Sequence, residues 1–175
     1  VDTSIGGKTG IDLPQGKNLM GVFKQPKAVL ADVATLQSLP AREFACGMAE
    51  VIKHSLIADT GLLEKVEKGG WRMDPGSLHA NLPALQDLVA QAIQVKIRIV
   101  QEDPFETGRR KVLNLGHTFA HALEQASGYR LRHGEAVAIG LAAASRLSAR
   151  LGCCAPGLPE RVEAVLAAVG LPTRI

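Results

Sequence analysis

The most informative segment of the chain is NLGHTFAHALEQASGYRLRHGE, from Asn114 to Glu135. It contains His117, His121 and His133, three of the chain's five histidines. Side chains three and four positions apart lie on the same face of an α-helix. We therefore predict that Asn114, His117 and His121 project from one face of one helix, and that His133 lies at the start of the next helix.

The spacing of His117 and His121 leaves two interpretations open. Histidines at positions i and i+4 of a helix commonly hold a divalent transition metal, because neutral imidazole nitrogen suits zinc and its neighbours. A pair of structural histidines that bond to the backbone fits the same spacing equally well. The segment HTFAH lacks the glutamate of the HExxH motif, so the sequence does not indicate a metalloprotease.

The composition favours one domain of closely packed helices. A chain of 175 residues is long enough to bury a sizeable core. Hydrophobic residues make up 46% of it but aromatic residues only 3%, so the interior must consist mainly of Ala, Val, Leu and Ile. The formal net charge of +3 is too small to indicate a nucleic-acid partner.

The cysteines and the apolar runs indicate the cellular compartment of the protein. The chain has 3 cysteines, an odd number, and two of them are adjacent, so no disulfide framework is indicated. This usage is typical of a reducing cytoplasm. The sequence shows no signal-peptide pattern and no apolar stretch of the length that a bilayer requires. We expect a cytoplasmic protein without a membrane partner.

Residues 1–40 differ in texture from the rest. The run VDTSIGGKTGIDLPQGKNLMG is rich in glycine and polar residues, which predicts loop and short strand. A Walker A motif would require glycine five positions before Gly7, where Asp2 stands, and this argues against a nucleoside-triphosphate site. Glycine-rich backbone beside Lys8 and Lys17 can still hold another anion. A solvated turn with two surface lysines fits these residues equally well.

The remaining pattern is helical apart from one short apolar run, Ala28 to Asp32, which suits a buried strand. His79 lies in a turn-rich connection and is expected to be solvated. Helix signals and apolar periodicity predict helices at about Ala41 to Ala58, Thr60 to Lys68, Pro83 to Gln101 and Leu158 to Val169, and small residues that permit close helix packing dominate from Gly134 to Leu151.

Several charged residues on these helices and in one loop can be interpreted either as structural or as functional. Glu50 and Lys53 share a helix face, either as a surface ion pair or as a metal ligand beside a substrate-binding lysine. Lys96 lies on an apolar stripe, from which it either extends to solvent or pairs with an anionic substrate. Arg110 lies in a loop, where arginine is usually solvated, but its fork also matches a carboxylate or phosphate.

Together these residues suggest one site. Glu50 with His117 and His133 would form a three-ligand zinc site with an open position for substrate. A high density of polar and cationic groups around it fits a substrate with more than one negative group. These groups are Lys53, Lys96, Arg110, Asn114 and His121.

Four runs carry a resemblance to a known family. VDTSIGGKTGIDLPQGKN, LPAREFACGMAEVIK, NLGHTFAHALE and HGEAVAIG closely resemble 3-dehydroquinate synthases, in the family's order and over essentially the whole chain. The resemblance implies a mainly α fold: the helical C-terminal metal-binding domain of the dehydroquinate synthase-like fold, preceded by a short β and loop remnant of an N-terminal α/β NAD-binding domain. It places the remnant at residues 1–40 and the helical metal- and substrate-binding domain, truncated at its C-terminus, at residues 41–175.

The resemblance also implies a reaction. Family members convert 3-deoxy-D-arabino-heptulosonate 7-phosphate to 3-dehydroquinate and phosphate in the shikimate pathway of aromatic amino-acid biosynthesis. They use NAD and a divalent cation, zinc or cobalt. A hydroxyl is transiently oxidised, phosphate is eliminated, the ketone is reduced back and the ring closes by an intramolecular aldol step. The implied class is a carbon–oxygen lyase, and the full-length protein is expected to be a homodimer.

The resemblance assigns roles position by position. It implies that the metal ligands are Glu50, His117 and His133. It implies a substrate shell of Lys53, Lys96, Arg110, Asn114 and His121, with Lys8 and Asn18 toward the phosphate and Glu106 near the pocket. Lys96 and Arg110 match positions toward the substrate carboxylate, and His121 a position for proton transfer. The positions that match NAD contacts are Asp2, Lys8, Lys17, Thr35, Leu36, Gln37 and Ser38.

Two alternatives remain beside this assignment. One is another sugar-phosphate cyclase, and the other is a non-catalytic helical remnant that kept metal binding. The family's glycine-rich nucleotide-binding half precedes the equivalent of Val1, and a C-terminal segment follows the equivalent of Ile175. We therefore expect that this chain alone does not turn over.

Overall fold

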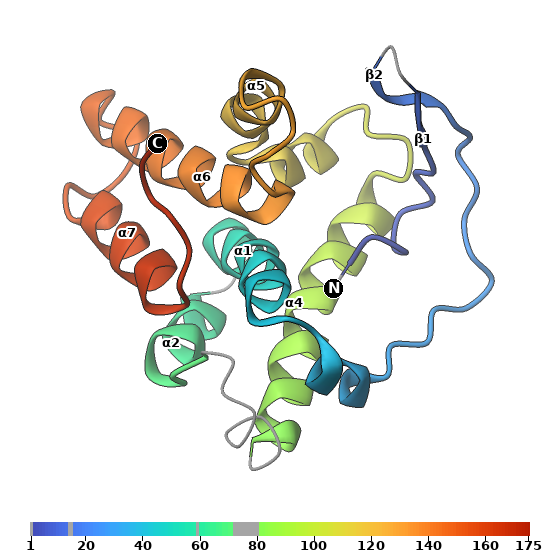
Figure 1. Cartoon of the computed structure of the whole chain (residues 1–175), viewed down its shortest axis with the longest axis horizontal. Coiled ribbons are helices and arrows are strands. Elements are labelled where there is room, and N and C mark those ends of the chain that lie inside the picture. Colours follow the sequence, from blue (N-terminus) through green and yellow to red (C-terminus); the bar gives the residue numbers. More distant parts are fainter. Residues whose placement is uncertain (1, 14–15, 59, 72–80) are drawn as a thin grey trace.

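The computed structural model describes residues 2–13, 16–58, 60–71 and 81–175, and it is mainly helical (Figure 1). A β-hairpin at the start of the chain precedes a bundle of helices. In chain order the elements are β1 (Ile11–Leu13), β2 (Gly16–Met20), the 3-10 helix η1 (Val33–Ser38), α1 (Ala41–Ala58), α2 (Thr60–Lys68), α4 (Leu82–Glu102), the 3-10 helix η2 (Arg109–Asn114), α5 (His117–Ala126), α6 (His133–Arg150) and α7 (Leu158–Ala168).

Helix α1 lies at the centre of the bundle. It packs against α2, α4, α6 and α7, and α6 in turn packs against α5 and α7 (Figure 1). The core between them consists mainly of Leu, Val, Ile and Ala, including the fully buried Ile52, Leu88 and Leu166. This confirms the expectation of a core with few aromatic side chains.

Glycines bring three helix backbones into contact. A Cβ at Gly134 in α6 would lie 2.3 Å from the carbonyl oxygen of Cys46 in α1. A Cβ at Gly140 in α6 would lie 2.1 Å from the carbonyl oxygen of Gly116, just before α5. The helices α1, α5 and α6 can approach this closely only because these positions carry no side chain. The first turn of α6 therefore lies beside α1, and the turn before α5 lies against the middle of α6.

The β-hairpin and the segment that follows it up to Asp32 form an exposed arm. Strands β1 and β2 pair antiparallel, with Ile11 opposite Met20 and Leu13 opposite Gly16. Figure 1 shows the hairpin apart from the helical bundle, with the start of the chain next to α4. Apolar side chains of the arm such as Phe23 are largely exposed.

The predicted strand from Ala28 to Asp32 is wrong. These residues belong to no strand, and Leu30 is 96% exposed. A short apolar run becomes a buried strand only where it pairs with another strand, and the only sheet among the described residues, the β1–β2 pair, does not include this segment. His79 lies outside the described residues, so its predicted exposure stays a prediction.

The helix predictions hold to within one residue. Helices α1 and α2 have the predicted bounds, α4 is one residue longer at each end, and α7 is one residue shorter at its C-terminal end. Pro83 lies in the first turn of α4, where its missing N–H costs no intrahelical hydrogen bond. None of the helices in the described ranges is both long and apolar enough to cross a membrane.

Candidate metal and substrate site

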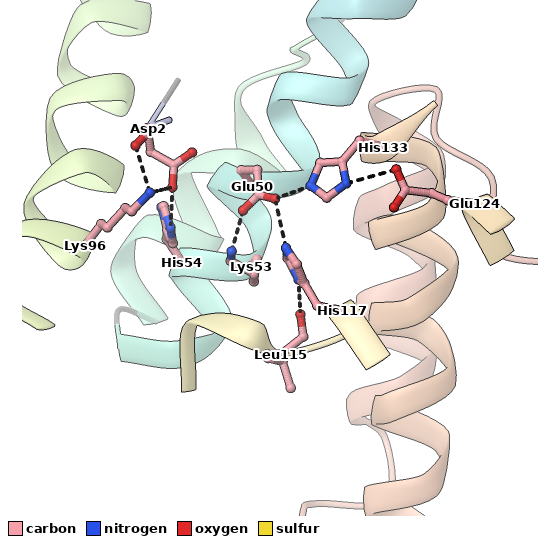
Figure 2. A network of polar contacts seen from close by, with 9 residues as sticks. All are labelled: Asp2, Glu50, Lys53, His54, Lys96, Leu115, His117, Glu124 and His133. Carbon is pink, nitrogen blue, oxygen red and sulfur yellow. Dashed lines mark hydrogen bonds and ion pairs between the residues drawn. The ribbon is translucent and has the colours of Figure 1, made fainter. Parts of the chain in front are cut away.

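Glu50, His117 and His133 converge from three helices (Figure 2). Glu50 lies in the middle of α1, whereas His117 is the first residue of α5 and His133 the first residue of α6. The Nε2 atoms of His117 and His133 lie 3.7 Å and 3.4 Å from the same atom, Glu50 Oε1. One donor atom from each residue lies within 4.8 Å of the other two, close enough for a single metal ion.

The far side of each imidazole ring faces an oxygen. His117 Nδ1 lies 3.2 Å from the carbonyl oxygen of Leu115, and His133 Nδ1 lies 3.4 Å from Glu124 Oε1 (Figure 2). Both rings thus direct Nε2 toward Glu50 and Nδ1 toward an acceptor. Histidines that ligate metals are typically held in this way. Two imidazole nitrogens and one carboxylate suit zinc or cobalt and leave a position open.

Lys53 keeps the Glu50 carboxylate ionised. Its Nζ lies 2.5 Å from Glu50 Oε2, and both side chains are mostly buried. Burial alone would raise the pKa of Glu50, but the hydrogen bond with His133 and the positive charge of Lys53 outweigh it and lower the pKa to about 2. The interpretation of Glu50 and Lys53 as a surface ion pair is therefore wrong.

The two histidines differ in protonation. Burial, followed by the charge of Lys53, lowers the pKa of His117 below its ordinary value. The hydrogen bond to Glu50 raises the pKa of His133, although burial opposes it. At any given pH, His117 is therefore more often neutral than His133, and a metal ion competes with a proton more at His133 than at His117.

A second carboxylate, Asp2, lies beside this triad. Lys96 Nζ contacts Asp2 Oδ2 at 2.8 Å and donates to the Asp2 carbonyl oxygen at 2.7 Å, while His54 Nε2 lies 3.4 Å from Oδ2 (Figure 2). Burial raises the pKa of Asp2, but the hydrogen bond with His54 and the charge of Lys96 outweigh it and hold the pKa well below its usual range. Lys96 is therefore mostly buried and has an anionic partner within the protein, which neither interpretation of this residue foresaw.

The arrangement of Asp2, Glu50 and His54 could also hold a metal by distance alone. However, the ammonium groups of Lys96 and Lys53 contact its two carboxylates and would repel a cation. In the first triad Lys53 contacts only the far oxygen of Glu50, and the histidine rings face the other. We therefore place the candidate metal at the first triad.

Arg110 ties two segments together at the edge of the site. Its guanidinium donates to the carbonyl oxygens of Pro104 at 2.6 Å and Gly6 at 2.7 Å, and it is 3% exposed. The Asp103 carboxylate shapes the same loop, because it accepts backbone N–H bonds from Gly108 at 2.8 Å and Arg110 at 3.0 Å. The alternative of a solvated Arg110 is therefore wrong.

The prediction that Asn114 lies on the same helix as His117 and His121 is wrong. Asn114 ends η2, and the chain turns at Gly116, whose φ of 78° is not helical, before α5 begins. Its Nδ2 donates to Glu106 Oε1 at 2.9 Å, and Lys8 forms an ion pair with the other Glu106 oxygen. The sequence could not reveal this turn, because helical spacing continues through Gly116.

One cavity unites these groups. It has a volume of about 650 Å³, and Glu50, His117 and His133 lie on its wall. Other charged and polar residues of the predicted site also line it, namely Asp2, Lys8, Lys53, Lys96, Glu106, Arg110 and Asn114, together with Arg132. The cavity therefore combines the metal triad with five basic side chains and with three further carboxylates, those of Asp2, Glu43 and Glu106, which form ion pairs with Lys96, Arg132 and Lys8.

Some predicted site residues are not brought to this cavity. His121 is exposed on α5 with its ring centroid 5.5 Å from that of His117, and it does not line the cavity. The predicted cofactor contacts Thr35, Leu36, Gln37 and Ser38 form part of η1, where Leu36 packs against the core. The side chains of Lys17 and Asn18 lie outside the described residues, so their roles stay predictions.

Several residues that shape the site were not assigned to it from the sequence. His54 follows Glu50 by one helical turn and shares its face of the helix, but no role was predicted for it. Glu124 ends the NLGHTFAHALE run on the same helix as His117, but nothing in the spacing shows that it faces His133. Arg132 and Asp103 contribute through loop geometry, which no sequence pattern indicates.

Two models of known protein families match the chain. The family described as 3-dehydroquinate synthase C-terminal matches residues 47–175, and the one described as 3-dehydroquinate synthase N-terminal matches residues 1–46. The chain belongs to the 3-dehydroquinate synthase family. Curated 3-dehydroquinate synthases of Synechococcus sp. and Paracoccus denitrificans are each 51% identical to it over 100% of the chain. The chain spans about half the length of these relatives, 47% in each case.

Solved structures of related cyclases share the fold. The 2-epi-5-epi-valiolone synthase of Streptomyces hygroscopicus, solved with NAD+ and Zn2+, is 29% identical with a TM-score of 0.87, over 100% of this chain and 48% of that protein. A 2-deoxy-scyllo-inosose synthase with carbaglucose-6-phosphate, NAD+ and Co2+ is 27% identical with a TM-score of 0.82, over 97% of this chain and 46% of that protein. The mainly helical fold expected of this family is thereby confirmed.

Proposed function

We propose that this chain provides the metal- and substrate-binding part of a 3-dehydroquinate synthase, a lyase that converts 3-deoxy-D-arabino-heptulosonate 7-phosphate to 3-dehydroquinate and phosphate. The observation that carries the proposal is the cavity in which Glu50, His117 and His133 lie among basic side chains. The identity of 51% to curated enzymes of this name supports it. Because the chain spans about half of those relatives, the complete reaction is part of the proposal.

A divalent metal ion and NAD would take part in the proposed reaction. Glu50 Oε1 and the Nε2 atoms of the two histidines would hold a divalent metal, in keeping with the donor set and the orientation of both rings. The metal would polarise substrate hydroxyls and NAD would supply the hydride exchange. Asp2 and Lys8 line the cavity and are proposed to face the cofactor, as are Lys17 and the residues Thr35 to Ser38.

The basic residues have donors to spare for the substrate. Lys96 has three N–H donors, and two Asp2 oxygens lie within hydrogen-bond distance of its Nζ. Arg110 has five N–H donors, and each of its two terminal nitrogens donates to one carbonyl oxygen. We assign these two residues to the substrate carboxylate. Each is already held in place by the protein, so little side-chain entropy is lost when the carboxylate binds.

The phosphate is proposed to bind at Lys8, Asn18 and Asn114. In the structure the Glu106 carboxylate contacts both Lys8 and Asn114. A phosphate at this position must therefore displace Glu106 or share its partners. Lys53 holds Glu50 in place beside the metal. His121 lies one turn beyond a ligand and is proposed for proton transfer.

The first experiment tests the metal. After dialysis against trace zinc, the unaltered chain is expected to retain about one zinc ion, because the three ligands come from helices of its own core. Glu50→Gln and His133→Ala are expected to lose it. The control is Glu163→Gln, which removes an ion pair with Arg146 between α6 and α7. An unaltered chain without zinc would contradict the proposed ligand set.

A second experiment separates the candidate functions. Calorimetric titration of the zinc-loaded chain compares 3-deoxy-D-arabino-heptulosonate 7-phosphate with glucose 6-phosphate, a sugar phosphate without a carboxylate group. We expect the ligand with the carboxylate to bind more tightly, and Arg110→Met to weaken this ligand selectively. Preference for glucose 6-phosphate would favour another cyclase. Zinc binding without affinity for either ligand would favour a non-catalytic metal-binding domain. The homodimer, the cytoplasmic location and the domain boundary after residue 40 stay predictions.

A further inference from the structure

Glu124 is a buried acid for which the proposed reaction gives no role. It lies in α5, seven positions after the ligand His117, and its side chain is 3% exposed. A buried carboxylate is costly unless polar groups compensate it. Its Oε1 lies 3.4 Å from His133 Nδ1, on the side of the ring that faces away from Glu50 (Figure 2). His133 thus lies between two carboxylates, one from α1 and one from α5.

The ring of His133 needs more support than that of His117. The His117 side chain is 14% exposed and its Nδ1 faces the carbonyl oxygen of Leu115, a fixed part of the backbone. The His133 side chain is 48% exposed, so packing alone restricts its rotation less. The acceptor on its Nδ1 is a side chain from another helix. A metal ligand at this position therefore depends on a second side chain for its orientation.

The acceptor also determines which ring nitrogen can bind a metal. A neutral imidazole carries one N–H, and an acceptor beside one nitrogen keeps the proton there. Glu50 Oε1 lies 3.4 Å from Nε2 and Glu124 Oε1 lies 3.4 Å from Nδ1, so each ring nitrogen has an acceptor. Once a metal lies between Nε2 and Glu50, only Nδ1 keeps an acceptor for the proton. When a metal binds, it displaces any proton from Nε2, while the proton on Nδ1 stays and is donated to Glu124.

We propose that Glu124 is a positioning residue for the metal site: it accepts the Nδ1–H of His133 and so directs the Nε2 lone pair toward the metal. The proposal rests on the metal ligands of the proposed function. Carboxylates in this position typically strengthen metal binding by about 10-fold to 100-fold. Glu124 thereby links α5 to the first residue of α6, so that one helix both supplies a ligand and orients another.

The test compares Glu124→Leu and Glu124→Gln with the unaltered chain and with the control Glu163→Gln. Affinity for Co2+ is measured by competition with a chelator, and the visible spectrum of bound Co2+ reports its coordination. We expect Glu124→Leu to bind Co2+ about 10-fold to 100-fold more weakly. Glu124→Gln is expected to lose less, because its amide oxygen can still accept the Nδ1–H. The control is expected to bind as the unaltered chain does.

A spectroscopic measurement addresses orientation directly. Long-range 1H–15N correlation spectra of the zinc-loaded, histidine-labelled chain assign the proton to Nδ1 or Nε2 in each ring. We expect the Nδ1–H form for both ligands in the unaltered chain, and a changed signal for His133 but not for His117 in both Glu124 variants. This comparison within one molecule separates an effect on orientation from general loss of structure.

The outcomes distinguish this inference from the proposal on which it rests. Equal Co2+ affinity and unchanged His133 signals in both Glu124 variants would overturn the role of Glu124 and leave the metal site intact. An unaltered chain that binds no Co2+ would overturn both. If Glu124→Leu does not fold, as judged by circular dichroism, the Glu124→Gln variant decides between them.

Discussion

The imidazole rings of the two histidine ligands differ in how strongly they bind a proton. The pKa of His133 is raised and that of His117 lowered, while the Glu50 carboxyl has a pKa of about 2. Of the three ligands, His133 therefore holds its proton to the highest pH, and a metal ion competes mainly with that proton. Glu50 offers no competition until the solution is strongly acidic.

Metal affinity should consequently fall as the pH is lowered through the pKa of His133. Below that pKa we expect the apparent association constant to fall about tenfold per pH unit, as for one displaced proton. Co2+ titrations at several pH values between about 6 and 8 measure this slope. Affinity that does not change over this range would contradict the protonated state of His133 in the metal-free protein.

The Asp103 carboxylate contributes to stability through its hydrogen bonds with the backbone. Backbone hydrogen bonds from Arg110 and Gly108 lower its pKa from 3.8 to about 2. Between these values the unfolded chain binds more protons than the folded chain, so stability rises with pH. The contribution of Asp103 is complete above about pH 4 and is lost as the pH falls through about 2.

The variant Asp103→Asn tests this contribution, because an amide keeps one acceptor but loses the charge. We expect it to be less stable than the unaltered chain at about pH 5, and the difference to shrink toward about pH 2.5. Urea unfolding of both proteins at each pH gives the comparison, which cancels the titration of other carboxylates. A difference that is constant with pH would contradict the hydrogen-bonded carboxylate.

At the scale of elements, the glycines of α6 set the distances between helices. Gly134→Ala would place a Cβ 2.3 Å from the Cys46 carbonyl oxygen, and no flexible side chain can move aside there. We expect the substitution to lower the free energy of unfolding by about 1–3 kcal/mol. It should also weaken metal binding, because it displaces the first turn of α6 and hence His133.

Gly157→Ala is the matched control. A Cβ at this position meets no atom within 4 Å, and the residue has an ordinary φ of -81°. The expected change in unfolding free energy is below about 1 kcal/mol, with metal binding unchanged. Urea unfolding and Co2+ titration of both variants make the comparison. Equal stability of the two variants would show that α1 and α6 can separate without cost.

Local signals predicted these elements well and the connections between them less well. Capping residues and apolar periodicity depend on neighbours in the sequence, and so α1 and α2 were predicted correctly. Asn114 was misplaced because the turn at Gly116 depends on its close contact with α6. The strand at Ala28 to Asp32 was wrong because a strand requires a partner that its own sequence cannot reveal.

The same distinction applies to the site. Glu50, His117 and His133 were found from residue type and motif, and the structure brings them together. The partners of the buried charges were not found, because Asp2 lies far from Lys96 in sequence and only the folded chain brings them into contact. Glu124 was missed for the same reason, since its contact with His133 depends on the angle between α5 and α6.

At the scale of the whole molecule, a bound metal would link three helices that pack in one core. The ligands come from α1, α5 and α6. Helix α6 packs against α1, α5 and α7, and α1 also packs against α7. An unfolded chain has no such arrangement, so binding should stabilise the fold as a whole. At a free zinc concentration of about 100 times the dissociation constant, the expected gain is about 2.7 kcal/mol.

Thermal unfolding measures this coupling. The expected gain corresponds to a rise in the melting temperature of roughly 5–10 °C for a chain of this size. Addition of a chelator should reverse the rise, and Glu50→Gln should show none. An equal rise in Glu50→Gln would indicate that zinc binds elsewhere on the molecule.

The glycine contacts between α6 and its neighbours have a consequence for the choice of ion. Helices whose backbones already touch at Gly134 and Gly140 cannot come closer, so the ligand cage cannot contract around a cation of small ionic radius. It can enlarge only if α6 moves away from α1 and gives up core contacts. The close packing of these glycines, beside the ligands His117 and His133, would thus favour metal ions within a narrow range of ionic radius.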